Sequence, residues 1–215
     1  MERPEDRLAI KALHLADILY ARIFHHMTVV SPCMIPRTGP AILVSNHIGT
    51  IDPACLQAAC HQRLITWMIA KEYQDIKGMG WLFNTVGIIP VDRNGRDTSS
   101  LRGALRALQA GRVLGVFPEG RFSPTHELLP FQTGIAMMAI KSNVPVFPAY
   151  IDGNYRNQDM LQSCVGRNDI RVAYGRPVEF DRSGTSHENL EAATAAIKLA
   201  VERLANKRVT FASAK

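Results

Sequence analysis

The sequence has few cysteines and no long uninterrupted apolar run. Four cysteines occur among the 215 residues, and no two of them have the two-residue spacing typical of zinc or redox sites: Cys33, Cys55, Cys60 and Cys164. The simpler interpretation of this pattern is a reduced compartment. The first seven residues contain no basic stretch that leads into an apolar core, so a cleaved secretory signal is not expected.

Other absences narrow the function. The chain contains no Gly-x-Ser-x-Gly segment, which disfavours a hydrolase with a serine nucleophile. It contains no aromatic stacking motif of the kind that binds single strands, so nucleic acid is not the expected partner. There is also no internal repeat and no low-complexity segment. The chemistry must therefore come from side chains at loops of a globular domain.

Length and composition are those of one globular domain. A chain of 215 residues fits a single core, and 47% apolar with 20% charged residues is ordinary for a soluble fold. Lys and Arg outnumber Asp and Glu by 25 to 19, which gives a net charge of +6. This excess favours contact with anionic surfaces such as phospholipid headgroups, nucleic acids or phosphorylated metabolites, and a solvated basic surface is the alternative.

The segment from Leu8 to Val30 is apolar but is interrupted by polar side chains, so it lacks the ~20 apolar residues that a membrane-spanning helix needs. On a helical wheel, a narrow basic arc holds Lys11, His14, Arg22 and His25. The broad apolar side holds Leu13, Ala16, Leu19, Ile23 and Phe24. Such an amphipathic helix can lie on an anionic membrane, and packing against the protein's own core is the alternative. We therefore divide the chain into a membrane-docking helix, residues 1–30, and a single domain, residues 31–215.

Strand and helix patterns alternate through that domain. The expected strands, rich in branched residues, cover 41–45, 64–70, 88–91, 113–117 and 144–151. The expected helices cover 98–110, 131–141 and a long segment from Thr185 to about Ala205. This alternation predicts an α/β fold with a largely parallel or mixed central sheet, covered by helices on both faces. Because Pro145 and Pro148 would forfeit ladder bonds, the strand 144–151 is expected at an edge or a bulge.

A histidine and an aspartate follow the first expected strand. His47 and Asp52 lie five positions apart in Ser-Asn-His-Ile-Gly-Thr-Ile-Asp-Pro, so on a regular helix they would point ~140° apart. Gly49 permits a turn that would bring them together, and Pro53 suits a helix start. The alternatives are that Asp52 only caps that helix and that His47 is a structural histidine. A metal site would need a third ligand; His61 is nearby in sequence, but metal ligands on a helix usually recur at closer spacing, so a metal site is not favoured.

Charged residues follow later strands in the same way. Asp92 and Arg93 end one strand, where the cation can reach a ligand phosphate. Phe-Pro-Glu-Gly-Arg ends another, and Arg121 in it suits bidentate binding of phosphate oxygens. Each segment could equally be a plain surface turn. Their repetition at successive strand ends favours a shared site.

These ordered segments resemble the four motifs of the glycerolipid acyltransferase superfamily, over about residues 41–150. The Asn-His motif with its following Asp is met by Asn46, His47 and Asp52. The resemblance implies that His47 is the general base and that Asp52 orients it. It also implies a role for Arg93 near an acceptor phosphate.

The later motifs match with departures. Glu119 and Gly120 fit the third motif, which implies that they contact substrate, but Arg121 stands where Thr is usual and Phe122 where Arg is usual. Gly49 replaces a frequent Ser in the first motif. Lys71 is similar to a lysine that the family places after the next strand, where it could touch the acceptor phosphate, although a surface lysine would look the same.

The resemblance implies an O-acyltransferase of phospholipid biosynthesis at the cytoplasmic face of the membrane, bound peripherally or monotopically. It implies no cofactor and no metal. The co-substrate would be an acyl thioester, either acyl-CoA or acyl carrier protein, and the acceptor a phosphate-bearing lipid, foremost 1-acyl-sn-glycerol 3-phosphate. Glycerol 3-phosphate, another lysophospholipid and an ornithine lipid remain open as acceptors. A lipid hydrolase and a non-catalytic membrane-binding module are the alternatives from other classes.

Overall fold

The computed structural model describes residues 8–76, 78–93, 97–123, 127–153 and 164–212, with side chains up to residue 206. Within these ranges the strands are β1 Thr28–Ser31, β2 Ala41–Ser45, β3 Ile65–Ala70, β4 Ile89–Val91, β5 Val113–Val116, β6 Val146–Asp152 and β7 Arg171–Tyr174. The α-helices are α1 Leu8–Leu19, α2 Asp52–Ala59, α3 Met79–Val86, α4 Thr98–Gln109, α5 Gly134–Ser142 and α7 His187–Ala212. A π-helical turn, η2, covers Tyr20–Phe24, and a 3-10 turn, η3, covers Lys71–Asp75.

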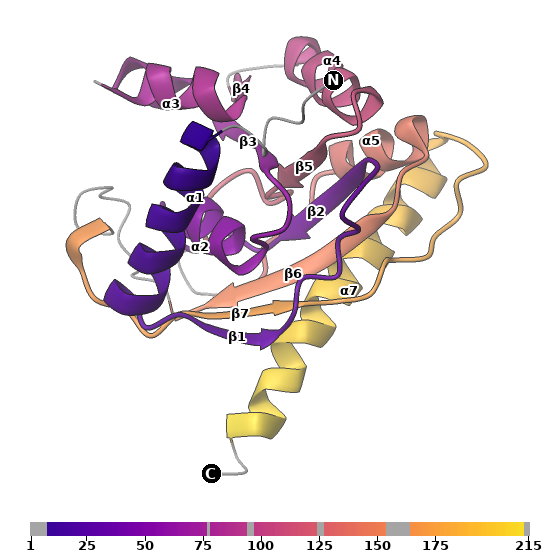
Figure 1. Cartoon of the computed structure of the whole chain (residues 1–215). Coiled ribbons are helices and arrows are strands. Elements are labelled where there is room, and N and C mark those ends of the chain that lie inside the picture. The colour runs from indigo at the N-terminus through magenta and orange to yellow at the C-terminus, as the bar shows by residue number, and fades with distance from the viewer. Residues whose placement is uncertain (1–7, 77, 94–96, 124–126, 154–163, 213–215) are drawn as a thin grey trace.

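The strands form one mixed sheet in the order β1-β7-β6-β2-β5-β3-β4 (Figure 1). From β6 to β4 all neighbours are parallel, whereas β7 runs antiparallel to β6 and β1 runs parallel to β7. The predicted α/β class with a largely parallel or mixed sheet is confirmed. Since the parallel strands end at one edge, the loops that follow them are brought together there.

Alternate residues of each strand face two separate cores. On β2, Leu43 packs with η2 and α2, while Val44 packs on the other face with α4, α5 and α7. Both residues are fully buried. Central strands covered on both faces must be apolar throughout, which explains why the β2 sequence Ala-Ile-Leu-Val-Ser has no polar alternation.

The prediction that the proline-containing strand lies at an edge is wrong. β6 is central, between β2 and β7. The ladder with β7 ends at the pair Ala149 and Tyr174, and the Pro148 carbonyl accepts a bond from Gly175 at 2.8 Å, just past the end of β7. The N–H that Pro148 lacks would point to the same side, beyond that ladder. The proline therefore costs no strand-to-strand bond.

The N-terminal helix differs from the predicted amphipathic helix in two respects. It ends at Phe24, because residues from Thr28 onward form β1 beside β7. The predicted basic face is also split: His25 is fully buried, and the His14 ring nitrogen Nε2 lies 3.2 Å from the Gln57 carbonyl of α2, whereas Lys11 and Arg22 are exposed. Helical spacing alone could not reveal which side α2 would cover. In the described part of the chain, no helix has the length and apolar character needed to cross a bilayer.

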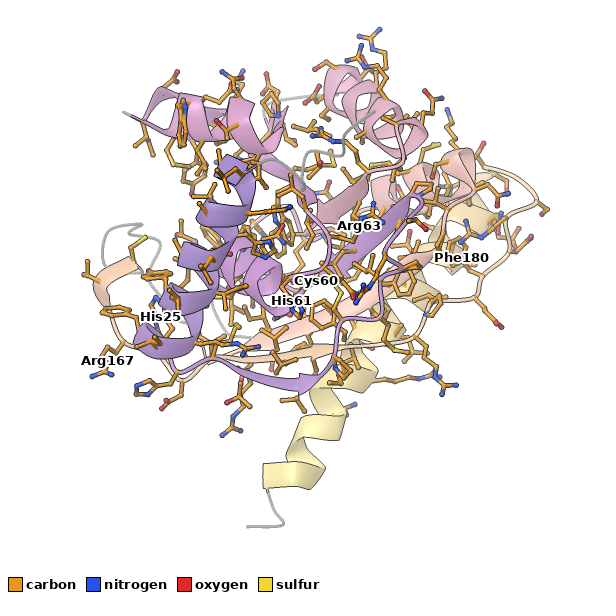
Figure 2. The ribbon with its side chains drawn as sticks, in the orientation of Figure 1. His25, Cys60, His61, Arg63, Arg167 and Phe180 are labelled. Atoms are coloured by element: carbon orange, nitrogen blue, oxygen red, sulfur yellow. A yellow bond between two sulfur atoms is a disulfide. The ribbon has the colours of Figure 1, made fainter. Side chains whose placement is uncertain are left out.

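Arg63 and a disulfide hold the loop between β1 and β2. Arg63 is 4% exposed and donates hydrogen bonds to the carbonyls of Pro36, Gly39 and Gly111. Cys33 and Cys60 are joined by a disulfide across 27 positions, which the expectation of a reduced compartment did not anticipate. Figure 2 shows Cys60, His61 and Arg63 together just after α2. The pairing depends on the path of the 31–40 loop, which spacing could not predict.

Replacing both Cys33 and Cys60 with Ser should lower stability without stopping catalysis. Closing a loop of this length removes denatured-state entropy worth up to ~3 to 4 kcal/mol. The loop keeps its bonds to Arg63 and Gln62, so the site beyond the other end of α2 should persist. Urea unfolding measures the loss, with Cys164→Ser, which removes a thiol outside the disulfide, as the matched control. Equal midpoints for the double variant and this control would contradict the prediction.

Candidate active site

Four neighbouring parallel strands place the predicted site residues at one edge of the sheet. His47 follows β2, Arg121 follows β5, Lys71 follows β3 and Arg93 follows β4. These strands are adjacent in the order β2-β5-β3-β4. Segments that are up to about 75 positions apart in the chain therefore meet at the carboxyl ends of the strands, where open α/β sheets bind ligands.

His47 and Asp52 are in direct contact. The Nδ1 atom of His47 lies 2.9 Å from Oδ2 of Asp52, which is fully buried. The same oxygen accepts hydrogen bonds from the N–H groups of Ile48 at 2.7 Å and Gly49 at 2.9 Å. An imidazole that donates from Nδ1 keeps Nε2 as an acceptor, so the geometry leaves Nε2 of His47 able to take a proton.

Asp52 does not cap α2 in the manner considered from the sequence. It is the first residue of α2, and its carboxylate bonds to N–H groups of the preceding turn rather than to those of the helix. Pro53 is the second residue of the helix and has no N–H to satisfy. Both features fold the 47–52 segment back on itself. The carboxylate thus organises the turn and orients the histidine at once.

Aromatic rings surround the His47 imidazole. The ring of Phe117 stacks on it with centroids 4.0 Å apart, and Phe122 lies at 4.3 Å in a tilted orientation. Trp67 of β3 stacks in turn on the outer side of Phe117 at 5.0 Å. This stack fixes the ring plane and leaves 17% of the His47 side chain exposed. No sequence pattern indicated a role for these aromatic residues, although Phe122 departs from the family motif.

The backbone of His47 is held by the loop after β5. Its N–H donates to Oε1 of Glu119 at 2.9 Å, and its carbonyl accepts from the N–H of Ser123 at 2.8 Å. The second oxygen of Glu119 accepts from the N–H of Leu129 at 3.1 Å. Glu119 is only 5% exposed. The expected substrate contact of Glu119 is therefore replaced by a positioning role, because both of its oxygens bind backbone.

Asn46 fixes the start of the same turn. Its amide donates to the carbonyl of Ile151 and accepts from the N–H of Ile151, both at 2.9 Å. The side chain thereby acts like one more residue of the β2–β6 ladder. His47 is thus anchored from two neighbouring strands, β5 through Glu119 and β6 through Asn46.

Lys71 and Arg93 are each paired with a carboxylate. Lys71 Nζ lies 2.6 Å from Asp92, and Arg93 lies 3.4 Å from Glu72. Two exposed ion pairs therefore link the end of β3 to the end of β4. Arg93 lines the cavity beside His47, whereas Lys71 does not. Exposed pairs of this kind are weak. A phosphate could displace Glu72 from Arg93, but the position of Lys71 favours a structural role at the rim.

Gly120 and Arg121 form the rim beneath Phe122. Gly120 has φ of +69°, and an added Cβ would meet the Gln132 amide at 2.4 Å, so only glycine fits this turn. Arg121 is exposed and lines the cavity. The N–H groups of Gly49 and Gly120 are bonded to Asp52 and to the Phe117 carbonyl, so both are already used within the protein.

His47 opens into a cavity of ≈ 1050 Å³. Its walls are mostly apolar and come from α1, α2, β3, α3 and α4, and Arg93 and Arg121 also line it. Typical small-molecule sites enclose ~300 to 1,000 Å³, so this cavity has room for long hydrocarbon chains. The metal alternative loses support, because His61 follows the far end of α2, about 12 Å from Asp52 for a helix of eight residues.

The site combines a parallel-sheet edge, a histidine bonded to a buried carboxylate and a large, mostly apolar cavity. The family model described as Acyltransferase matches residues 26–152, more than half of the chain. The chain belongs to this acyltransferase family, which confirms the resemblance and makes it an O-acyltransferase.

Individual proteins with similar sequences are also named as acyltransferases. The chain is 25% identical over 175 residues to a 1-acyl-sn-glycerol-3-phosphate acyltransferase of Bacillus subtilis, covering 80% of this chain and 85% of that protein. It is 29% identical over 147 residues to the 1-acyl-sn-glycerol-3-phosphate acyltransferase alpha of Mus musculus, covering 64% of this chain and 50% of the mouse protein. It is 26% identical over 156 residues to a lyso-ornithine lipid O-acyltransferase of Pseudomonas aeruginosa, covering 71% of this chain and 58% of the Pseudomonas protein.

A solved structure has the same fold. The crystal structure of the 1-acyl-sn-glycerophosphate acyltransferase from Thermotoga maritima superposes with a TM-score of 0.73 at 23% identity, covering 97% of this chain and 84% of that one. The likeness extends over the N-terminal helix as well as the sheet. It establishes the architecture within which the His47 site lies.

Replacing Glu119 with Gln should change how stability depends on pH. Burial raises the pKa of Glu119 to about 7, above its unfolded value of ~4.3. A raised folded pKa contributes stability that is complete below the unfolded pKa and is lost as pH rises through the folded one. The unfolding free energy of the wild type, minus that of the variant, should therefore fall between about pH 4 and 7. Urea unfolding across this range measures the difference, with Glu179→Gln, which changes an exposed side chain, as the matched control. A difference for Glu119→Gln that does not change with pH would contradict the prediction.

Proposed function

We propose that the chain transfers a fatty acyl group from acyl-CoA or acyl carrier protein to the free hydroxyl of 1-acyl-sn-glycerol 3-phosphate, giving phosphatidate. The observation that carries the proposal is the His47–Asp52 contact at 2.9 Å, opening into the apolar cavity. The names of the Bacillus, mouse and Thermotoga relatives support this acceptor.

The chemistry needs one general base. Nε2 of His47 takes the hydroxyl proton as the acceptor oxygen attacks the thioester carbonyl, and Asp52 stabilises the resulting imidazolium. The tetrahedral intermediate then expels the thiolate, which recovers a proton from His47. Because a thiol has a pKa of ~8.5, its thiolate is a good leaving group. The Phe117 and Phe122 rings keep the imidazole in the plane that this transfer requires.

Two arginines support a phosphate-bearing acceptor. Arg93 follows β4 and Arg121 follows β5, and both line the cavity into which His47 opens. A guanidinium binds two phosphate oxygens in parallel, which suits a phosphate monoester. Asp92 pairs with Lys71 and Glu72 pairs with Arg93, so these two carboxylates neutralise part of the positive charge at the rim. Because such exposed pairs are weak, a ligand phosphate can displace Glu72 from Arg93.

His47→Ala should abolish transfer of a labelled acyl group from acyl-CoA to lysophosphatidate, with a loss of at least ~10² to 10⁴-fold, because the general base is absent. The melting temperature should stay near that of the wild type. The wild type is also tested on three other acceptors: glycerol 3-phosphate, a lysophospholipid without a phosphate monoester and a lyso-ornithine lipid. Among the four acceptors, lysophosphatidate should give the highest kcat/KM.

The matched control is His61→Ala, which changes an exposed histidine after the far end of α2 and should keep full activity.

Arg121→Ala should raise KM for lysophosphatidate more than for the lysophospholipid. Wild-type turnover in His47→Ala would reject the mechanism, and a preference for another acceptor would reject the assigned substrate.

We further propose that the exposed side of α1 and η2 docks peripherally on an anionic membrane, at the cytoplasmic face where acyl thioesters are supplied. Four large apolar side chains are exposed there: Leu8 at 83%, Leu15 at 57%, Leu19 at 49% and Ile23 at 66%. Lys11 and Arg22 are exposed beside them. An apolar surface flanked by cations is the pattern of helices that lie in the interface of anionic bilayers. The proposal rests on this outer face, since His14 and His25 face the protein.

The triple variant Leu15→Glu, Leu19→Glu and Ile23→Glu should lose sedimentation with phosphatidylglycerol vesicles by at least about tenfold, because burial of three large apolar side chains is worth several kcal/mol. Activity on a water-soluble short-chain acceptor should remain. Leu199→Glu, which changes an apolar side chain of α7 that is 45% exposed, is the control and should bind normally. Undiminished vesicle binding by the triple variant would place docking elsewhere.

A further inference from the structure

A carboxyl group lines the cavity on the side formed by α1. Asp17 belongs to the inward face of α1, together with Leu13 and His14, and this face packs against α2. The same cavity reaches His47 at the strand ends. The lining on this side also includes the apolar side chains of Ile10 and Leu13.

Asp17 has no hydrogen-bond partner among the described residues, whereas its polar neighbours are already bound. The Tyr20 hydroxyl donates to the Cys164 carbonyl at 2.6 Å, and the His14 ring bonds the Gln57 carbonyl. Asp17 interacts electrostatically with Tyr20 and with Cys55, the latter about one turn after Asp52 on α2. Burial raises the pKa of Asp17 to about 7. A half-buried carboxyl is thus left with free hydrogen-bonding capacity in an apolar wall.

This arrangement is costly for an ordinary fatty chain. When saturated hydrocarbon fills the cavity, it strips water from Asp17 and offers no hydrogen bond in return. A ligand group that can pair with the carboxyl avoids that cost. Sites built to bond a hydroxyl reject analogues that lack it far more strongly than apolar pockets reject an added methylene.

We propose that Asp17 is a specificity-determining residue that binds a hydroxyl group on the hydrocarbon chain of a lipid substrate. The inference rests on the proposed function, since it takes the cavity to hold the acyl chains. The hydroxyl can come from the donor chain or from the chain already on the acceptor, and the chemistry at Asp17 is the same. A neutral hydroxyl fits a carboxyl whose charge is disfavoured by burial. The phosphate end of the acceptor belongs instead to Arg93 and Arg121, at the strand ends.

Binding is measured by calorimetry in the full-length His47→Ala background, so that turnover does not consume the ligand. The donor probes are palmitoyl-CoA and a hydroxypalmitoyl-CoA series with the hydroxyl near the thioester, at mid-chain or at the chain end. The acceptor probes are lysophosphatidates with a palmitoyl or hydroxypalmitoyl chain. One of the hydroxylated probes should bind at least about tenfold more tightly than the same molecule without the hydroxyl. Whether that probe is a donor or an acceptor identifies the source of the hydroxyl.

Adding Asp17→Leu should remove this preference and strengthen binding of the unsubstituted chain. Asp17→Ala is measured beside it, so that a packing defect of Leu does not decide the result, and Asp17→Asn should retain part of the preference because an amide still bonds a hydroxyl. The inference would be overturned if the ratio of affinities for hydroxylated and unsubstituted probes were the same with and without the Asp17 carboxyl. It would also be overturned if no hydroxylated probe bound more tightly than its unsubstituted counterpart. Failure of the proposed function is a separate result: no His47-dependent transfer from any donor to any acceptor.

Discussion

The fold of the site depends on one carboxylate oxygen. Oδ2 of Asp52 collects hydrogen bonds from His47, Ile48 and Gly49, and this bends the chain between β2 and α2 into a closed turn. The turn presents the imidazole at the edge of the sheet, with Nδ1 bonded to Asp52. Without that oxygen, two backbone N–H groups and the ring would lose their common partner. The orientation of His47 and the structure of the loop therefore have the same physical origin.

The surrounding layers serve to keep this turn in place. Asn46 ties its start to β6, Glu119 ties the His47 backbone to the loop after β5, and the Phe117 ring limits rotation of the imidazole. The first contact comes from β6 and the other two from the segment after β5. Together they hold the His47 imidazole in one orientation, although the loop that carries it has no regular structure of its own.

Polar groups in the cavity divide it into two chemical regions. At the strand ends, Arg93 and Arg121 provide positive charge, and the ion pairs of Lys71 and Glu72 lie at that rim. Toward α1 the lining is Ile10 and Leu13 together with the polar side chains of His14, Asp17 and Tyr20. Under the proposed function, the reaction joins a charged headgroup to a hydrocarbon chain, and a cavity with two basic side chains at one end and mostly apolar walls suits both.

Periodicity and turn residues determined the α/β class, the central strands and the helices predicted over 98–110 and 131–141, because these patterns are local; the second of these begins three residues later, at Gly134. The glycine between His47 and Asp52 also allowed the turn that brings the two side chains into contact. Tertiary structure alone decided which side of α1 is buried, that Pro148 belongs to a central strand, that Cys33 meets Cys60 and that Glu119 holds backbone instead of substrate. Each of these outcomes depends on which distant segment comes to lie beside the residue, and neither helical spacing nor residue type contains that information.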